Sequence, residues 1–263
     1  MKKIVGLLIA VLCGTTLINA QDNGDFRFGF KFEPNVSWLN PKDKNLESTG
    51  SSLRFSYGLN ADIMFAENYA FGTGLTVTSN GGEVTYLSEY NSDSGNYIVE
   101  KIRDYNNKYV EIPLTLKLRT NEIGYMTYWF QFGLGLGVNI DARANEEIEF
   151  KYQQIQGSTP DELIWSKEVS LPAKVTNDKE PIGNDVRTFR TALIIGAGVE
   201  YSLSGSTAII GGITFNNGFS NVLKKDGIRK TDTGEPIFED GEPKSFDLKA
   251  ISNHLGLTIG ILF

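Results

Sequence analysis

The chain has almost none of the residues that most metal sites, disulfides and acid–base catalysts need. Its 263 residues include a single cysteine, Cys13, and a single histidine, His254. Cys13 lies in a predicted export signal, so we expect no cysteine and no disulfide in the mature chain. Transition-metal sites are built mainly from His and Cys side chains. The sequence therefore predicts no metal site, no cofactor and no enzymatic activity.

Long apolar runs are also missing, because no stretch after residue 20 reaches the roughly 18 apolar residues of a membrane-spanning helix. Residues 1–20 instead have a charged start at Lys2 and Lys3, a short apolar stretch and small residues at the end. This arrangement predicts a signal peptide (1–20) that is cleaved before the mature chain (21–263). Lipid attachment at Cys13 is disfavoured, because bulky Leu12 precedes it where a small residue is required.

Positive charge is in deficit. Lys and Arg number 25 against 32 Asp and Glu, which gives a net charge of −7, and loss of the two lysines of the signal makes it −9. An acidic chain disfavours nucleic acid as a partner.

What the sequence does contain is strict alternation of apolar residues, most clearly in the last ten residues. Leu255, Leu257, Ile259, Ile261 and Phe263 are apolar, and the residues between them are mostly small or polar. This period of two, ending on a terminal aromatic residue, is typical of the closing strand of a transmembrane β-barrel.

The same alternation recurs in seven other segments: 26–33, 54–65, 69–78, 110–119, 128–141, 192–201 and 209–215. The sequence therefore predicts an all-β fold, an eight-stranded antiparallel up-and-down transmembrane β-barrel. A soluble barrel has the same period but hides its apolar face inside. We disfavour it because the face opposite the apolar one is rich in glycine and poor in charge.

The connections fall into two classes. Short turns are predicted near 66–68, 120–124 and 204–206, and long polar loops at 39–52, 88–101, 142–186 and 217–247. Short turns on the periplasmic side and long extracellular loops are usual for outer-membrane barrels. Alternation within 142–186 predicts an extended hairpin above the membrane. Trp165 on this hairpin is predicted to be an exposed aromatic residue available to a partner or ligand.

Lipid-facing aromatic residues near the short turns should form one interfacial girdle. The residues predicted for it are Phe26, Phe65, Tyr69, Phe71, Tyr128, Tyr201 and Phe263.

The inward positions carry charges of both signs. Those predicted to form a lumenal network are Arg27, Lys31, Arg54, Asp62, Glu111, Lys117, Arg119, Arg190 and Glu200, with Glu33 and Asp141 as further inward carboxylates. Eight strands enclose a space that side chains can just fill. Since unpaired buried charges are costly, these groups should pair and plug the lumen. In particular, Arg27 is expected near Asp62, and Glu200 near Lys117 or Arg119.

The sequence offers two alternative sites. His254 is the one candidate for a general base, and its inward position favours a role as polar filler of the lumen. The acidic residues of the third long loop are Glu146, Glu147, Glu149, Asp161, Glu162 and Glu168. They lack the spacing of a calcium loop, which favours a solvated charged face over calcium binding.

Residues Tyr109, Glu111, Ile112 and Pro113, followed by Lys117, resemble the Y-x-E-I-P-L…K strand of PorT-like outer-membrane barrels from the Bacteroidetes. The resemblance implies an eight-stranded barrel without a cofactor, and a link to protein secretion through the type IX pathway. Pro113 cannot donate a ladder hydrogen bond and is expected at a bulge or twist point.

The sequence thus predicts a non-enzymatic barrel in the bacterial outer membrane. Its expected partners are outer-membrane lipid or lipopolysaccharide and, through its loops, envelope or secretion proteins. It would be an accessory or structural component of an envelope assembly or a surface binding module. A lipid-modifying enzyme and a small passive porin stay open as alternatives.

Overall fold

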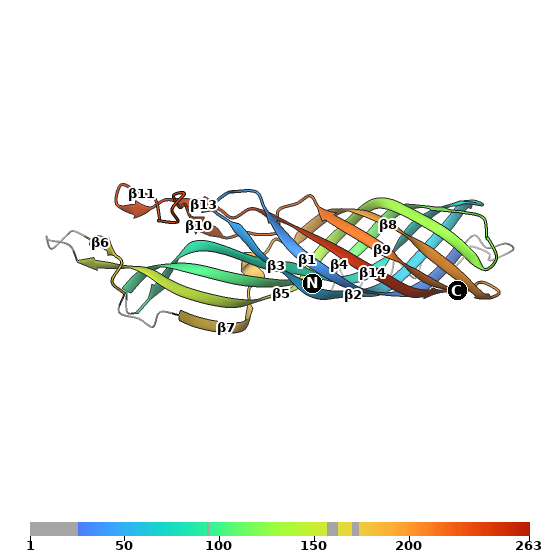
Figure 1. The fold of residues 1–263 in the computed structure, drawn as a ribbon, viewed down its shortest axis with the longest axis horizontal. Coiled ribbons are helices and arrows are strands. Elements are labelled where there is room, and N and C mark those ends of the chain that lie inside the picture. Colours follow the sequence, from blue (N-terminus) through green and yellow to red (C-terminus); the bar gives the residue numbers. More distant parts are fainter. Residues whose placement is uncertain (1–25, 94, 157–162, 170–173) are drawn as a thin grey trace, which may run out of the picture.

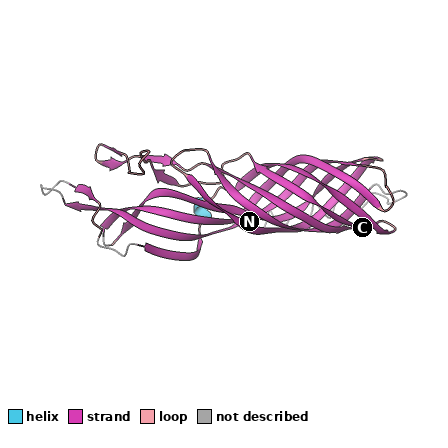
Figure 2. Cartoon of the chain, in the orientation of Figure 1, coloured by secondary structure: helices cyan, strands magenta, loops and turns pink. Residues whose placement is uncertain are grey.

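The computed structural model describes residues 26–93, 95–156, 163–169 and 174–263, which are all-β apart from one 3-10 turn, η1 (Gly183–Asp185) (Figures 1 and 2). The predicted signal peptide and the tip of the predicted hairpin at 157–160 lie outside the described residues.

Eight strands close into a ring in the order β1–β2–β3–β4–β5–β8–β9–β14, and β14 pairs back with β1. Neighbouring strands in this ring are antiparallel, which confirms the predicted eight-stranded up-and-down barrel. The ring strands are β1 (Phe26–Pro41), β2 (Glu47–Ala66), β3 (Tyr69–Ser92), β4 (Gly95–Arg119), β5 (Met126–Gln156), β8 (Phe189–Ser204), β9 (Thr207–Gly218) and β14 (Ala250–Leu262).

The two faces of the ring have opposite chemistry. Phe30 and Leu257 point outward and are 57% and 50% exposed, whereas Glu33 and Lys117 point inward and are 3% and 2% exposed. Apolar side chains on the outside and buried charges on the inside are the reverse of a soluble barrel. The exposed apolar band is the surface that lipid would cover.

Three strands continue far beyond the ring. Figure 1 shows β3, β4 and β5 projecting as a long twisted sheet from one end of the barrel, while the C-terminus lies at the other end. The remaining short strands add to this projection or lie beside it: β6 (Leu163–Ser166) and β7 (Lys174–Pro181) pair with β5, β10 (Asp226–Ile228) pairs with β3 and β13 (Ser245–Asp247), and β11 (Phe238–Glu239) pairs with β12 (Glu242–Pro243).

The sequence-based loop assignment was wrong at 88–101, where β3 runs to Ser92 and β4 begins at Gly95. The loop predicted at 39–52 is also shorter, since β1 ends at Pro41 and β2 begins at Glu47. Tyr97, Ile98 and Val99 are consecutive and all fully buried, because both faces of the projecting sheet are covered. A strand buried on both faces loses the alternation by which the barrel strands were found.

Candidate functional site

Glu200 is the centre of the ion network in the half of the lumen nearest the short turns. Its carboxylate accepts contacts from Arg27 at 2.6 Å, Lys117 at 2.7 Å and Arg119 at 2.9 Å. Lys117 also lies 2.5 Å from Asp62. Arg27 is opposite Asp62 in the β1–β2 register, but its guanidinium pairs with Glu200. One carboxylate thus links β1, β4 and β8 across the lumen.

A second buried pair fills the lumen nearer the projecting sheet. Arg190 donates to Glu111 at 2.8 Å, to Asn216 Oδ1 at 2.6 Å and to the carbonyl of Ser252 at 2.9 Å. Gly135 makes room for this pair, because a Cβ at that position would lie 2.8 Å from Glu111 Oε1. These bonds use both terminal nitrogens of a guanidinium that is fully shielded from solvent, while its Nε has no hydrogen-bond partner in the described part of the chain.

His254 is buried between these two clusters. Its Nε2 lies 3.4 Å from Glu33, which also accepts a hydrogen bond from Thr258 at 2.9 Å. Thr258 in turn contacts Thr214 at 2.8 Å. His254 is 2% exposed, so no substrate in solvent or lipid reaches it in this arrangement.

A small cavity of about 50 Å³ in the lumen is lined by Lys31, Asp62, Pro113 and Lys117 among others. A space of this size holds on the order of one to a few waters. Pro113 is buried in β4, and the β3–β4 pairing stops at Gly72–Thr115 and resumes in the same register at Thr76–Glu111. Pro113 therefore interrupts the ladder without the predicted bulge, because its missing N–H removes a bond but adds no residue.

The β4–β5 pairing has its irregularities elsewhere, one between Lys108 and Tyr109, where Ile140 of β5 is the extra residue, and one between Ile98 and Val99, where Lys151 is the extra residue. Tyr109 is fully buried and packs at the upper end of the lumen.

Arg54 does not belong to the lumenal ion network in which it was predicted. Its guanidinium donates to Asp104 at 2.8 Å and 2.9 Å and to the carbonyl of Tyr105 at 3.1 Å.

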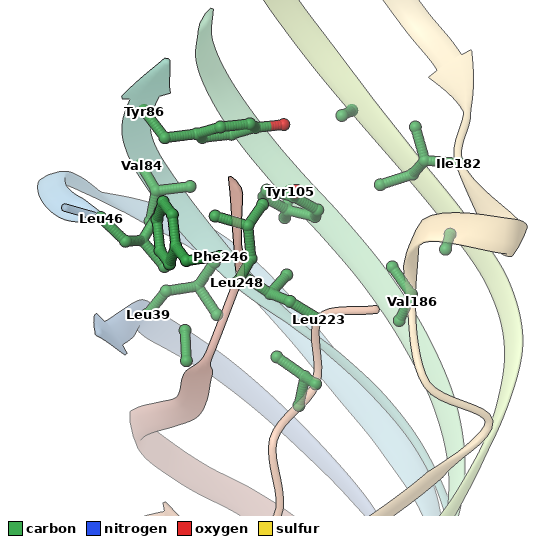
Figure 3. Packing of buried hydrophobic residues seen from close by; sticks show 14 of the residues in the cluster. Leu39, Leu46, Val84, Tyr86, Tyr105, Ile182, Val186, Leu223, Phe246 and Leu248 are labelled. Atoms are coloured by element: carbon green, nitrogen blue, oxygen red, sulfur yellow. The ribbon is translucent and has the colours of Figure 1, made fainter. Parts of the chain in front are cut away.

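Above the ion pairs, the mouth of the barrel is closed by a packed apolar core, which the sequence analysis missed. Figure 3 shows side chains from the β1–β2 connection, from the projecting sheet and from the chain on both sides of β10–β13 meeting in one cluster. Members of this mouth core are Leu39, Leu46, Val84, Tyr86, Tyr105, Ile182, Val186, Leu223, Phe246 and Leu248. Part of the signal was present as apolar residues, such as Leu46 and Leu223, within segments predicted to be polar loops, whereas Val84, Tyr86 and Tyr105 lie outside those segments.

A buried ion pair continues from the mouth core into the projecting sheet. Arg103 contacts Glu146 and lies 2.9 Å from Asp185, and its guanidinium stands over the ring of Tyr105. Burial, and after it the charge of Arg103, lowers the pKa of neighbouring Lys101 to about 8. Burial would raise the pKa of Asp185, but Lys225 and then Arg103 hold it below its ordinary value.

Trp165 is half-buried, which corrects the prediction of an exposed ring. It packs against the cluster of Leu87, Ile98 and Ile228, and its ring centroid lies 6.2 Å from that of Phe238. Residues of another long loop, 217–247, cover this ring. The sequence of the hairpin alone does not indicate that contact.

Three of the acidic loop residues contact basic side chains of the chain itself. Glu146 contacts Arg103, Glu147 contacts Lys174 and Glu149 lies 2.6 Å from Lys151. Asp161 and Glu162 lie outside the described residues. Within the described ranges, no group of three or more His, Cys, Asp or Glu side chains is placed to hold a metal ion. The described helical segment is likewise too short to cross a bilayer.

The seven residues predicted for the girdle all lie on exposed strand positions or at the C-terminus, between 37% for Phe263 and 63% for Phe65. Phe65 stacks on Tyr69 across the short β2–β3 turn, with ring centroids 6.1 Å apart. They are therefore available to a membrane interface at the end opposite the projecting sheet.

A family model of the outer membrane protein beta-barrel domain matches residues 19–224. No curated protein matches the chain. Among solved structures, the attachment invasion locus protein Ail of Yersinia pestis is 10% identical, with 91% of this chain and 100% of that chain covered and a TM-score of 0.34.

Two further structures show the same level of similarity. OprG of Pseudomonas aeruginosa is 10% identical, covering 92% of this chain and 96% of its own, with a TM-score of 0.36. The outer membrane protease OmpT of Escherichia coli is 7% identical, covering 95% and 99%, with a TM-score of 0.35. At these scores the similarity carries no argument about function.

Proposed function

Because the chain belongs to the family of outer membrane protein β-barrel domains, we propose that it is a non-enzymatic bacterial outer-membrane barrel acting through the part it carries outside the membrane. It would serve as a surface binding module or as a structural component of an envelope assembly. The single observation that carries the proposal is the contrast between a filled barrel and a large external sheet.

The filled barrel argues against transport. Ion pairs around Glu200 and Arg190 occupy the lumen, and the mouth core around Leu223 lies above them. A diffusive pore needs a continuous water path, and its selectivity usually comes from one sign of charge. Expelling these paired groups from the lumen would cost several kcal/mol.

The external sheet argues for binding. β3, β4 and β5 form a paired sheet with buried apolar clusters, and Ile155 and Ile164 form an exposed apolar cross-strand pair on its β5–β6 extension. Exposed apolar side chains on a rigid support are suited to a protein partner. The Tyr109–Pro113 strand favours a PorT-like role in type IX secretion as the specific assembly, through its resemblance alone.

Planar-bilayer recording tests the passive-porin alternative. The purified full chain should give no steady single-channel conductance, because the lumenal cavity is only about 50 Å³. Regular ohmic steps would overturn the proposal. The enzyme alternative depends on His254, so His254→Ala should leave lipid composition and partner binding unchanged. Loss of a lipid hydrolysis activity in that variant would favour the enzyme instead.

Photo-crosslinking in native membranes tests the binding role. The double variant Ile155→Ser/Ile164→Ser should lose protein cross-links formed by the full chain, since it removes the exposed apolar pair and leaves the strand pairing intact. Glu180→Gln, on the exposed β7, is the matched control and should retain them. Equal cross-links in both variants would remove this pair from the binding surface, and no cross-links in the native chain would contradict the role.

A further inference from the structure

A groove with a volume of about 420 Å³ lies where the barrel wall passes into the projecting sheet. Its charged lining comes from four strands. The groove residues are Arg54 of β2, Asp104 and Lys108 of β4, Asp141 and Arg143 of β5, and Lys179 of β7. On β4 and β5 they stand in register, with Lys108 opposite Asp141.

The groove opens on the outer face of the wall. The lumenal side of β4 carries Tyr105 and Tyr109, both fully buried, whereas Lys108 and Arg143 have side chains 43% and 54% exposed. Arg54 reaches the groove across β3, where the residues opposite Asn106 and Tyr105 are Gly81 and Gly82 and have no side chains in the way.

The charge of the groove is opposite to that of the chain. Four cations face two carboxylates, a local excess of two positive charges in a protein whose net charge is −7. Arg54 is bound to Asp104 by two contacts, and Lys108 and Arg143 share Asp141, each at 3.4 Å. Asp141 cannot neutralise two cations, and no ion-pair partner of Lys179 lies within 4 Å in the described part of the chain. The groove therefore has unused capacity for an anion.

Lys179 is held in place by a strained backbone. Its φ is 55°, in the left-handed region, and its N–H donates to Asn145 Oδ1 at 2.9 Å. Such a conformation costs a non-glycine residue on the order of 1 kcal/mol or more and persists only when neighbouring contacts fix it. Asn145 lines the same groove. The hydrogen bond from Lys179 to Asn145 and the backbone conformation that it fixes therefore place Lys179 at this groove.

The surface directly below the groove is apolar. Val110, two residues along β4 from Lys108, begins the lipid-facing band, and Ile112, two residues further, is exposed. On β5, Ile140 and Val138 are 56% and 44% exposed. Two strand residues span roughly 7 Å. A ligand seated in the groove thus has anion-binding groups at its upper part and hydrocarbon-compatible side chains beneath.

From this arrangement we propose that the groove binds the phosphorylated sugar headgroup of an outer-leaflet glycolipid, with the acyl chains lying along Val138 and Ile140. Charged hydrogen bonds from lysine and arginine suit phosphate oxygens. The inference relies on the outer-membrane location given by the family and not on the proposed protein partner, so either can fail alone.

The test uses the full chain in phosphatidylcholine nanodiscs containing bisphosphorylated lipid A or its fully dephosphorylated form. Bound lipid is measured by native mass spectrometry after release in detergent. The native chain should retain the bisphosphorylated lipid at least about tenfold better, and lowering the salt concentration should widen the difference. Equal retention of both lipids would overturn the proposal.

The variant Lys108→Ser/Arg143→Ser/Lys179→Ser should lose this preference at least about tenfold, since it removes three charged donors. The matched control Lys44→Ser/Lys244→Ser/Lys249→Ser makes the same change in charge at exposed lysines elsewhere and should change retention less than twofold. Equal loss in both triple variants would show general charge attraction and contradict the site.

Two further measurements test whether loss of binding comes from a folding failure and whether the groove binds free phosphate. Lys108→Gln and Lys179→Gln, each a single exposed substitution, should each lower retention two- to fivefold. Inorganic phosphate at about 10 mM, enough to fill most of a site with a Kd of about 1 mM, should not displace the lipid. Full displacement at that concentration would identify a free phosphate site and overturn the lipid assignment.

Discussion

The ammonium group of Lys117 lies 2.7 Å from the carboxylate of Glu200, although their strands, β4 and β8, are separated by β5 in the barrel. Both side chains are almost fully buried, at 2% and 1% exposure. The contact passes beside Trp129, whose ring centroid lies 5.5 Å from Lys117 Nζ. The barrel is therefore held shut by side chains that bridge strands beyond nearest neighbours.

Glu200→Gln should destabilise the barrel by about 3–5 kcal/mol, because it removes the carboxylate that Arg27 and Arg119 contact and leaves Lys117 with Asp62 alone. Urea unfolding in lipid vesicles, followed by tryptophan fluorescence, measures this change. Asp232→Asn breaks an exposed pair with Lys44 and should cost less than about 0.5 kcal/mol. Similar costs for the two variants would contradict the central role of Glu200.

Leu223→Ala should loosen the mouth core without unfolding the barrel. Leu223 is fully buried, and such truncations cost about 2–5 kcal/mol. The destabilisation is confined to the external segment. A protease added to intact vesicles should therefore cut the variant within 219–249 at least about tenfold faster than the native chain. Val175→Ala, at a position 36% exposed on β7, is the control and should leave the cleavage rate unchanged. An unchanged rate for Leu223→Ala would mean that the core does not close the mouth.

The barrel could be predicted from sequence because lipid imposes one rule on every strand. From Tyr128 to Ile140 every second residue meets hydrocarbon, so the alternation is uninterrupted and the strand was identified at nearly its true position within β5. Ion pairing among the inward-facing charged side chains could be predicted, because an unpaired buried charge is energetically unfavourable. The contacts of Glu200 with Lys117 and Arg119 were expected, but the pairing of Arg27 with Glu200 and not with Asp62 did not follow, because it depends on the stagger of the strands.

The external half could not be predicted in the same way. Ile98 and Val99 are buried on opposite faces of one sheet, covered by different segments. Leu223 and Phe246 belong to the mouth core but are separated by polar residues in the sequence. Their burial depends on contacts between segments that are distant in the sequence. The alternation of residues within one strand carries no information about such contacts. The same holds for Arg54, whose partner Asp104 is two strands away.

Lys101→Met should stabilise the protein at neutral pH. Burial lowers the folded-state pKa of Lys101 to about 8, below the unfolded value of 10.5, so folding carries a cost below pH 8 that disappears as pH rises to 10.5. A shift of this size corresponds to about 3 kcal/mol. The advantage of Lys101→Met in urea unfolding should therefore be largest at pH 7 and nearly absent at pH 10.5.

Lys249→Met is the control for this pH dependence, because the Lys249 side chain is 57% exposed. It should change stability little at either pH. Buried Tyr86 and Tyr105, whose pKa values burial raises, affect all variants alike above pH 10 and so cancel in the difference. A Lys101→Met advantage that stays constant with pH would contradict the lowered pKa.

Arg190 and Glu111 should behave as one unit in a double-mutant cycle. Arg190→Met and Glu111→Gln should each cost about 3–5 kcal/mol, because each leaves a buried charge without its partner. The double variant removes both charges, so its cost should fall below the sum of the single costs by about 2 kcal/mol or more.

The same cycle on Lys249 and Asp247, 3.9 Å apart and exposed, should give a coupling below about 0.5 kcal/mol. Asn216 and the carbonyl of Ser252 also bind Arg190, so Glu111→Gln alone should leave the guanidinium partly satisfied and cost less than Arg190→Met. Additive costs at Arg190 and Glu111 would mean that the Glu111 carboxylate stabilises β4 locally, beside Pro113, and not through the bond that joins β4 to β8.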